Sequence, residues 1–256
     1  IAVFNDELRD ACKKGGLSEG AGFITGKPVS KSILVSNILG QPINNYKADD
    51  PGDSVQYLVC HEGITLHDSV LYNTPLNEAI SAQKLEAIKR IKMGNFIAST
   101  SQGVGFFHAG QERGRTKPKL NSTTELSGNF VRNSYDSSDN INQFIWTLDA
   151  DYQGLLDYTK GLIEMRKNTS AFRLGTQDAV NANTDVLEKE TKNMDQTVSY
   201  SVKADGYTYF VVMNASKTAQ TVNVGVPVAN AEVLADSVKA GSTAISAPKG
   251  VKTEET

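Results

Sequence analysis

The stretch Val55-Gln56-Tyr57-Leu58-Val59-Cys60 decides the fold of this 256-residue chain. It is almost continuously apolar, which is typical of a strand that is covered on both faces. Residues 75–99, which follow it, carry apolar side chains at helical spacing and predict a long helix. A short strand is expected next, over residues 104–107, and a second long helix over residues 152–167. This alternation of strands and helices predicts parallel βα units.

The same pattern extends toward the N-terminus. Residues 1–4 predict a short buried strand, and residues 7–14 predict a helix with Asp6 as its N-cap. Residues 33–38 are expected to form a further helical turn. The helical spacing rests on Leu76, Ile80, Leu85, Ile88 and Ile91 in the first long helix and on Leu155, Tyr158, Ile163 and Met165 in the second. Three βα units are therefore predicted in this half of the chain.

The pattern changes after about Phe172. Short strands are expected over residues 198–202, 207–213, 221–224 and 232–234, separated by turns such as Ala204-Asp205-Gly206. Such short strands and turns predict an antiparallel β-domain. The sequence thus predicts two domains, over residues 1–172 and 173–256.

Composition excludes several classes of function. The chain is 39% hydrophobic and 21% charged, as is usual for a globular protein. Its net charge of −3 leaves no basic footprint for nucleic acid or for a membrane surface. The sequence contains no apolar run long enough to span a bilayer. Cys12 and Cys60 fit no metal spacing and are predicted to be free thiols.

Both ends of the sequence predict a fragment of a longer protein. It begins with Ile1-Ala2-Val3-Phe4, without an initiator Met, and it stops in a polar run. Localisation is therefore left open, although the Asn-, Thr- and Lys-rich tail is compatible with a secreted or cell-surface bacterial enzyme. No Asp cluster has the spacing of a calcium-binding loop, so no metal or cofactor is predicted.

Four segments carry a resemblance to a known family. They are Val3-Phe4-Asn5-Asp6-Glu7-Leu8-Arg9-Asp10, Gln56-Tyr57-Leu58-Val59-Cys60-His61-Glu62-Gly63-Ile64-Thr65-Leu66, Ser101-Gln102-Gly103-Val104-Gly105-Phe106-Phe107-His108-Ala109-Gly110-Gln111-Glu112 and Arg132-Asn133-Ser134-Tyr135-Asp136-Ser137-Ser138-Asp139. In this order they resemble the C-terminal part of type I pullulanases, which belong to glycoside hydrolase family 13, the α-amylase superfamily. The second segment resembles the last conserved region of that superfamily. The fourth, with Asn142 and Trp146, resembles the Asn-Ser-Tyr loop of pullulanases.

The resemblance implies an α/β plus all-β architecture. Residues 1–172 would supply the last three βα units of a (β/α)8 TIM barrel, and residues 173–256 an antiparallel C-terminal β-sandwich. Active sites of such barrels lie at the carboxyl ends of the strands. His61, Glu62 and residues 108–112 fall at those ends.

The implied activity is the cleavage of α-1,6-glucosidic bonds in pullulan, starch or glycogen. Retaining glycosidases use two carboxylates about 5 Å apart, one as nucleophile and one as acid/base. In this family both come from strands that would precede Ile1, so this chain alone is expected to be inactive. The implied partners are an α-glucan polysaccharide or oligosaccharide and the missing N-terminal half of the barrel.

The resemblance also implies a set of site residues. Glu62 occupies the third carboxylate position, which stabilises the transition state and is an Asp in the family. Its extra methylene matters, because a displacement of about 1 Å at such a site can cost roughly a hundredfold in rate. The predicted substrate-binding residues are His61, Asn133, Tyr135, Asp136 and His108.

Several alternatives stay open at this point. Asn133, Tyr135 and Asp136 could equally belong to a loop held by Asx turns, and His108 could be a packed histidine. His67 and Asp68 are interpreted as a loop or helix-capping pair, and Trp146 as a core residue. The parent protein could be an isoamylase-like enzyme or an α-1,4-specific amylase. The chain could also be a non-catalytic α-glucan-binding fragment, or a structural remnant.

Overall fold

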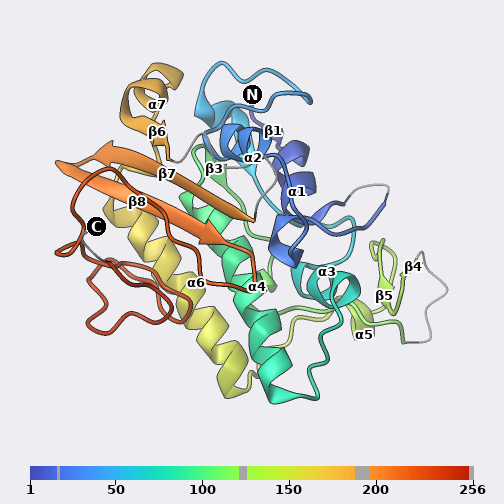
Figure 1. Ribbon diagram of the computed structural model, residues 1–256. Helices are drawn as coiled ribbons and strands as arrows, with labels where there is room; N and C mark the ends of the chain where they lie inside the picture. Colours follow the sequence, from blue (N-terminus) through green and yellow to red (C-terminus); the bar gives the residue numbers. More distant parts are fainter. Residues whose placement is uncertain (16–17, 121–125, 188–195, 254–256) are drawn as a thin grey trace.

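The computed structural model describes residues 1–15, 18–120, 126–187 and 196–253 (Figure 1). Its α-helices are α1 (Asp6–Lys13), α2 (Lys31–Ile38), α3 (Leu66–Asn73), α4 (Ser81–Thr100), α5 (Asp139–Asn142), α6 (Ala150–Asn168) and α7 (Gln177–Asn183). Short 3-10 helices are η1 (Phe23–Thr25), η2 (Pro51–Asp53) and η3 (Gln111–Arg113). The strands are β1 (Val3–Phe4), β2 (Ser54–Gln56), β3 (Val104–Gly105), β4 (Leu126–Ser127), β5 (Phe130–Val131), β6 (Thr184–Val186), β7 (Thr197–Ala204) and β8 (Tyr207–Asn214).

Strands β1, β2 and β3 form a three-stranded parallel sheet in that order. Val3 pairs with Ser54, and Val55 pairs with Val104. The prediction of three parallel strands is confirmed. The deciding strand is shorter than expected, because β1 and β3 are two residues long and pair with β2 only as far as Gln56. The next residues, 57–59, are nevertheless buried.

Polar side chains bind the sheet to the segments beside it. The amide of Asn5 donates to Gln56 Oε1 over 3.0 Å, and Gln56 Nε2 donates to the carbonyls of Asn37 at 2.8 Å and Gln102 at 2.7 Å. All four residues are fully buried. Buried amides with their partners in place specify a single arrangement, since an unpaired one would cost about 1–3 kcal/mol.

Helix α1 is capped by Asn5, so the predicted cap at Asp6 was wrong by one residue. The Asn5 side chain accepts the Leu8 N–H over 3.1 Å, and α1 begins at Asp6. Asp6 instead accepts a hydrogen bond from Tyr57 and forms an ion pair with Arg9 at 3.2 Å. An N-cap side chain satisfies free N–H groups of the first turn, and Asn serves this role as well as Asp.

Helices α4 and α6 lie side by side and confirm the two predicted long helices (Figure 1). Most of their expected core positions are buried: Ile88, Ile91, Leu155, Tyr158 and Met165. Ile80, Leu85 and Ile163 were expected on the same faces, but they are 48%, 46% and 44% exposed. Ile80 precedes α4, which begins later than predicted, at Ser81.

Strands β6, β7 and β8 form an antiparallel sheet. The β7–β8 turn is Asp205-Gly206, and both residues have positive φ, 54° and 81°. Such a two-residue turn matches the twist of a hairpin and favours Asp-Gly. Ala204 accordingly pairs with Tyr207, as the predicted turn requires.

Two predicted strands, over residues 221–224 and 232–234, are wrong. Neither segment forms a strand in the described part of the chain, where the nearest pairing is an isolated bridge between Ala235 and Ala240. Short Val-containing segments become strands only where a neighbour pairs with them. Strand β6 and helix α7 were not predicted. The structure therefore shows one antiparallel sheet here, and a two-layered sandwich stays a prediction.

A continuous core crosses the predicted boundary at Phe172. Tyr200 of β7 is fully buried, and its hydroxyl donates to the Thr100 carbonyl at the end of α4 over 3.0 Å. Val198 and Val202 on the same strand join the cluster that also holds Ile97. The two predicted domains thus share apolar packing.

No helix among the described residues is long and apolar enough for a membrane crossing.

Candidate functional site

His61 and Glu62 lie in the loop that follows β2. Their side chains are 75% and 67% exposed, and His61 Nε2 lies 3.6 Å from Glu62 Oε1. The sequence predicted that Glu62 would face a sugar site rather than bulk solvent. Within this chain the carboxylate is solvent-exposed, because no described element covers the loop.

Buried charges fix the backbone immediately after Glu62. The Lys13 ammonium donates to the Ile64 carbonyl over 3.1 Å, and the Ile64 N–H donates to Glu19 Oε1 over 2.9 Å. Lys13 and Glu19 form an ion pair at 3.3 Å, with side chains 2% and 1% exposed. Gly63 has φ 76°, and a Cβ there would lie 2.8 Å from Glu19 Oε1. The loop therefore needs glycine at this position.

The structure brings Asn133 to Glu62. The two residues form an isolated antiparallel bridge between the loop after β2 and the segment after β5. Tyr135 and Asp136 follow in the same segment and are exposed, Tyr135 at 79%. The carbonyl of Ser134 accepts from the Asn142 amide over 2.6 Å, which holds this loop to α5.

His108 follows β3 and is half-buried. Burial lowers its pKa to about 4, and the charges of Arg115, Lys117 and His61 act in the same direction. The imidazole of His108 is therefore neutral at pH 7. A neutral imidazole both donates and accepts a hydrogen bond, which suits a sugar hydroxyl.

The buried charged residues of this region were missed in the sequence. Lys13, Glu19 and Lys117 are fully or almost fully buried as side chains, although such residues are normally on the surface. Nothing in their spacing distinguishes them from surface charges, because each is also held by a backbone group far away in the chain, at Gly63 or Ile64. The free thiols predicted for Cys12 and Cys60 are confirmed.

His67 and Asp68 lie in the first turn of α3, whose N-cap is Thr65, so the predicted loop or helix-capping pair was wrong. Asp68 is fully buried and accepts from the Lys117 N–H over 2.8 Å. His67 contacts Asp68 Oδ1 at 2.9 Å and Glu78 Oε2 at 3.0 Å. Burial opposes protonation of this ring, but the two carboxylates outweigh it and raise the pKa of His67 to about 9.

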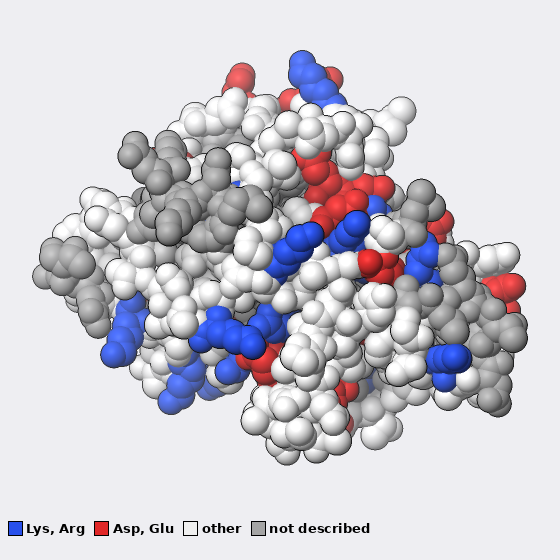
Figure 2. All heavy atoms as spheres, turned by 45° about the vertical axis from the view of Figure 1, so that its right-hand side comes forward, with Lys and Arg blue, Asp and Glu red and all other residues white. Residues whose placement is uncertain are grey.

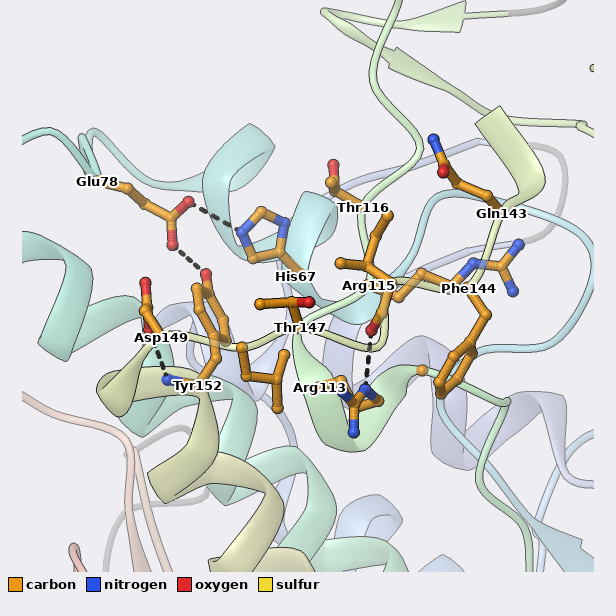
Figure 3. A pocket seen from close by; sticks show the side chains of 14 residues that line it. His67, Glu78, Arg113, Arg115, Thr116, Gln143, Phe144, Thr147, Asp149 and Tyr152 are labelled. Carbon is orange, nitrogen blue, oxygen red and sulfur yellow. Dashed lines mark hydrogen bonds and ion pairs between the residues drawn. The ribbon is translucent and has the colours of Figure 1, made fainter. Parts of the chain in front are cut away.

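A pocket of about 280 Å³ lies beside this pair (Figure 3). Glu78 reaches into it from one side and binds both His67 and the Tyr152 hydroxyl. Phe144 and Arg113 line the opposite side. None of the predicted site residues lines this pocket, so it is separate from the loop of His61 and Glu62.

Trp146 is not a core residue, contrary to the sequence interpretation. It is 79% exposed, and its ring packs against Phe144 with 4.7 Å between the centroids. The Arg113 guanidinium lies over both rings, 5.2 Å from Phe144 and 5.8 Å from Trp146. Arg113 also donates to the Ile145 carbonyl over 3.0 Å, so this segment is tied to η3.

The charges of the molecule are mixed. Figure 2 shows one face, on which Lys and Arg are interspersed with Asp and Glu and large areas carry neither. Among the described residues, no three His, Cys, Asp or Glu side chains are grouped as metal ligands would be. The predicted site residues carry groups that can bind hydroxyls: the carboxylates of Glu62 and Asp136, the imidazoles of His61 and His108, the Asn133 amide and the Tyr135 hydroxyl.

Comparisons with known proteins define the class. The chain resembles the C-terminal part of pullulanases, as its motifs predicted, and residues 182–256 match the family model described as SpuA C-terminal. Pullulanase A of Streptococcus pneumoniae serotype 2 is 34% identical over 293 aligned positions, which cover 100% of this chain and 23% of that protein. The chain thus spans about a quarter of the length of that relative.

Two solved structures extend the likeness to three dimensions. The product complex of the multi-modular glycogen-degrading pneumococcal virulence factor SpuA has a TM-score of 0.92 at 33% identity, covering 100% of this chain and 30% of that one. The Group B Streptococcus pullulanase SAP, in complex with maltotetraose, has a TM-score of 0.89 at 32% identity, covering 99% and 37%.

Proposed function

We propose that this chain forms the C-terminal part of a starch-debranching hydrolase that cleaves α-1,6-glucosidic bonds in pullulan, starch or glycogen. In this proposal, β1, β2 and β3 are the last strands of a (β/α)8 barrel of the α-amylase superfamily. The nucleophilic Asp and the acid/base Glu of a retaining mechanism come from polypeptide N-terminal to the chain. This chain supplies the third carboxylate and part of the sugar-binding surface.

One observation carries the proposal: the loops after β2, β3 and β5 converge. Glu62 and Asn133 are joined by a backbone bridge, and the Lys117 ammonium, in the segment after β3, donates to the carbonyls of Gly63 and Arg132. Loops that follow the carboxyl ends of parallel strands are where barrel enzymes place their active sites. The pullulanase SAP, a neighbour in structure, was solved with maltotetraose, which supports an oligosaccharide as the ligand.

The parallel sheet also supports a missing partner segment. Val3, Phe4 and Val104 on its two outer strands are 45%, 45% and 48% exposed. Phe4 packs edge-on against Tyr57 and Phe106, with centroids 4.8 and 5.3 Å apart. An exposed apolar surface on open sheet edges favours association, and further barrel strands would cover it.

In the reaction, Glu62 would stabilise the positive charge that develops on the sugar ring. A fixed carboxylate acts best where water is excluded and where its position matches the transition state. His61 and neutral His108 would bind sugar hydroxyls together with the Asn133 amide, and Tyr135 and Asp136 follow Asn133 in the same segment.

The test is a hybrid protein in which this chain replaces the matching C-terminal region of pneumococcal pullulanase A. We expect the hybrid to release maltotriose units from pullulan and the 256-residue chain alone to release none. In the hybrid, His61→Ala and Glu62→Gln should each lower kcat/KM by about a hundredfold or more.

Three outcomes would contradict this proposal. A hybrid that folds and binds maltotetraose without hydrolysing pullulan would favour the non-catalytic glucan-binding alternative. Hydrolysis of amylose in preference to pullulan would favour an α-1,4-specific enzyme. A folded hybrid with neither binding nor activity would indicate a structural remnant. Circular dichroism and a cooperative melt establish folding in each case.

A further inference from the structure

We propose that Lys117 is a positioning residue for the candidate sugar site. Its ammonium group joins the two backbone segments that carry Glu62 and Asn133 and holds them in register. This inference rests on the proposed function for its consequence in catalysis, but the contacts that carry it are independent of the substrate.

The ammonium of Lys117 binds two carbonyls that belong to different loops. Its Nζ donates to the Gly63 carbonyl over 2.7 Å and to the Arg132 carbonyl over 3.2 Å. Gly63 directly follows Glu62, and Arg132 directly precedes Asn133. The backbone bridge between Glu62 and Asn133 therefore lies beside this ammonium. A shift of the ammonium would move both site residues.

Lys117 is itself held in place from its own backbone. Its N–H donates to Asp68 Oδ2 over 2.8 Å, and its carbonyl accepts from the Val131 N–H over 2.8 Å. Asp68 is fully buried and is in turn fixed by His67. The side chain of Lys117 thus extends from a fixed base to the site, rather than adapting to it.

The free-energy cost of burying the Lys117 ammonium argues against a role in stability alone. Lys117 is 1% exposed, and burial lowers its pKa to about 8. Asp68 and Glu19 favour its charged form, whereas Arg115 and Lys13 oppose it. A buried cation is costly unless it is paired, and an apolar side chain of similar size is often as stable or more so. Because the carbonyls of Gly63 and Arg132 are far apart in the sequence, one charged group that binds both can hold the two loops in position.

A second effect follows for His108. The charge of Lys117 lowers the pKa of that imidazole, after burial and Arg115. Lys117 therefore contributes to keeping His108 neutral, in the form that both donates to and accepts from a hydroxyl.

The inference can be tested in the pullulanase hybrid with Lys117→Met. Lys119→Met is a matched control, because Lys119 is two residues further along the chain and exposed. Loss of register should lower kcat about ten- to a hundredfold for Lys117→Met, with a smaller change in KM. Its melting temperature should change little, because removal of a buried cation offsets the loss of the donor to two carbonyls. Lys119→Met should change neither.

A double-mutant cycle separates positioning from a general structural effect. If Lys117 acts through Glu62, then Lys117→Met should have little further effect on kcat in a Glu62→Gln background. Multiplicative losses in kcat would overturn the inference. Equal kinetics for the Lys117 and Lys119 variants would overturn it as well.

Hydrogen exchange keeps the inference testable if the proposed function fails. An inactive wild-type hybrid would contradict the proposed function. In the same protein, Lys117→Met should still accelerate amide exchange in residues 62–64 and 131–134, compared with Lys119→Met. Unchanged exchange in both segments would show that Lys117 does not position them.

Discussion

Glu62 and Asn133 form an antiparallel backbone bridge that joins the loop after β2 to the segment after β5. The bridge brings together two motifs that are far apart in the sequence and that were each predicted to contact sugar. It therefore turns two separate loops into one surface with a carboxylate and an amide side by side.

Glu62→Asp in the hybrid should raise kcat. The resemblance to the family implies Asp at this position, and the extra methylene of Glu62 would push its carboxylate into the proposed sugar site. If the misplaced carboxylate is the only cause of a low kcat, the increase in kcat can reach about a hundredfold. Glu62→Gln should lower activity, since it removes the charge. Measuring kcat and KM on pullulan decides the matter, and unchanged kinetics in both variants would show that Glu62 is not a site residue.

Gly63→Ala should destabilise the chain by about 1–3 kcal/mol, because φ is 76° and the new Cβ would press on Glu19. Gly52→Ala is the control: nothing lies within 4 Å of its Cβ position and its φ is not left-handed. Urea unfolding of the two variants should differ by more than about 1 kcal/mol. Equal stabilities would mean that the loop after Glu62 is not fixed as described.

The charge of His67 should make stability depend on pH. Its pKa is raised to about 9 in the folded chain, against about 6.5 unfolded. Its contribution is therefore complete below pH 6.5 and is lost as the pH rises through 9. The full loss is about 3 kcal/mol. The difference in free energy of unfolding between wild type and His67→Gln should shrink over this range. A difference that is constant from pH 6 to 9.5 would contradict the charged state of His67.

Residues 1–172 on their own should aggregate or behave as a molten species. Removing β7 strips Val198, Tyr200 and Val202 from a core they share with α4. The exposed edges of the parallel sheet add a second surface that promotes association. Size-exclusion chromatography and thermal melting test this, and a monomeric, cooperatively melting fragment would contradict it.

The sequence predicted what depends on local pattern. Three parallel strands, two long helices and the Asp205-Gly206 hairpin were anticipated, because apolar periodicity and turn chemistry act over a few residues. The strands expected over 221–224 and 232–234 failed, because pairing depends on a neighbour that the local sequence does not contain.

The candidate site shows the same division. Motifs identified His61 and Glu62, but the partners that hold them could not be predicted. Lys13, Glu19 and Lys117 are buried through contacts with backbone groups in other loops. Trp146 was assigned to the core from its residue type, and its contact with Arg113 at the surface arises in three dimensions.

The most direct test of the central claim is a crystal structure of the hybrid with maltotetraose. If this chain supplies the sugar site, a glucose unit should lie against Glu62 and His61, with hydrogen bonds of about 2.7–3.2 Å to their side chains. Asn133 should contact the same oligosaccharide. An ordered maltotetraose bound elsewhere, with Glu62 and His61 still in solvent, would contradict the account.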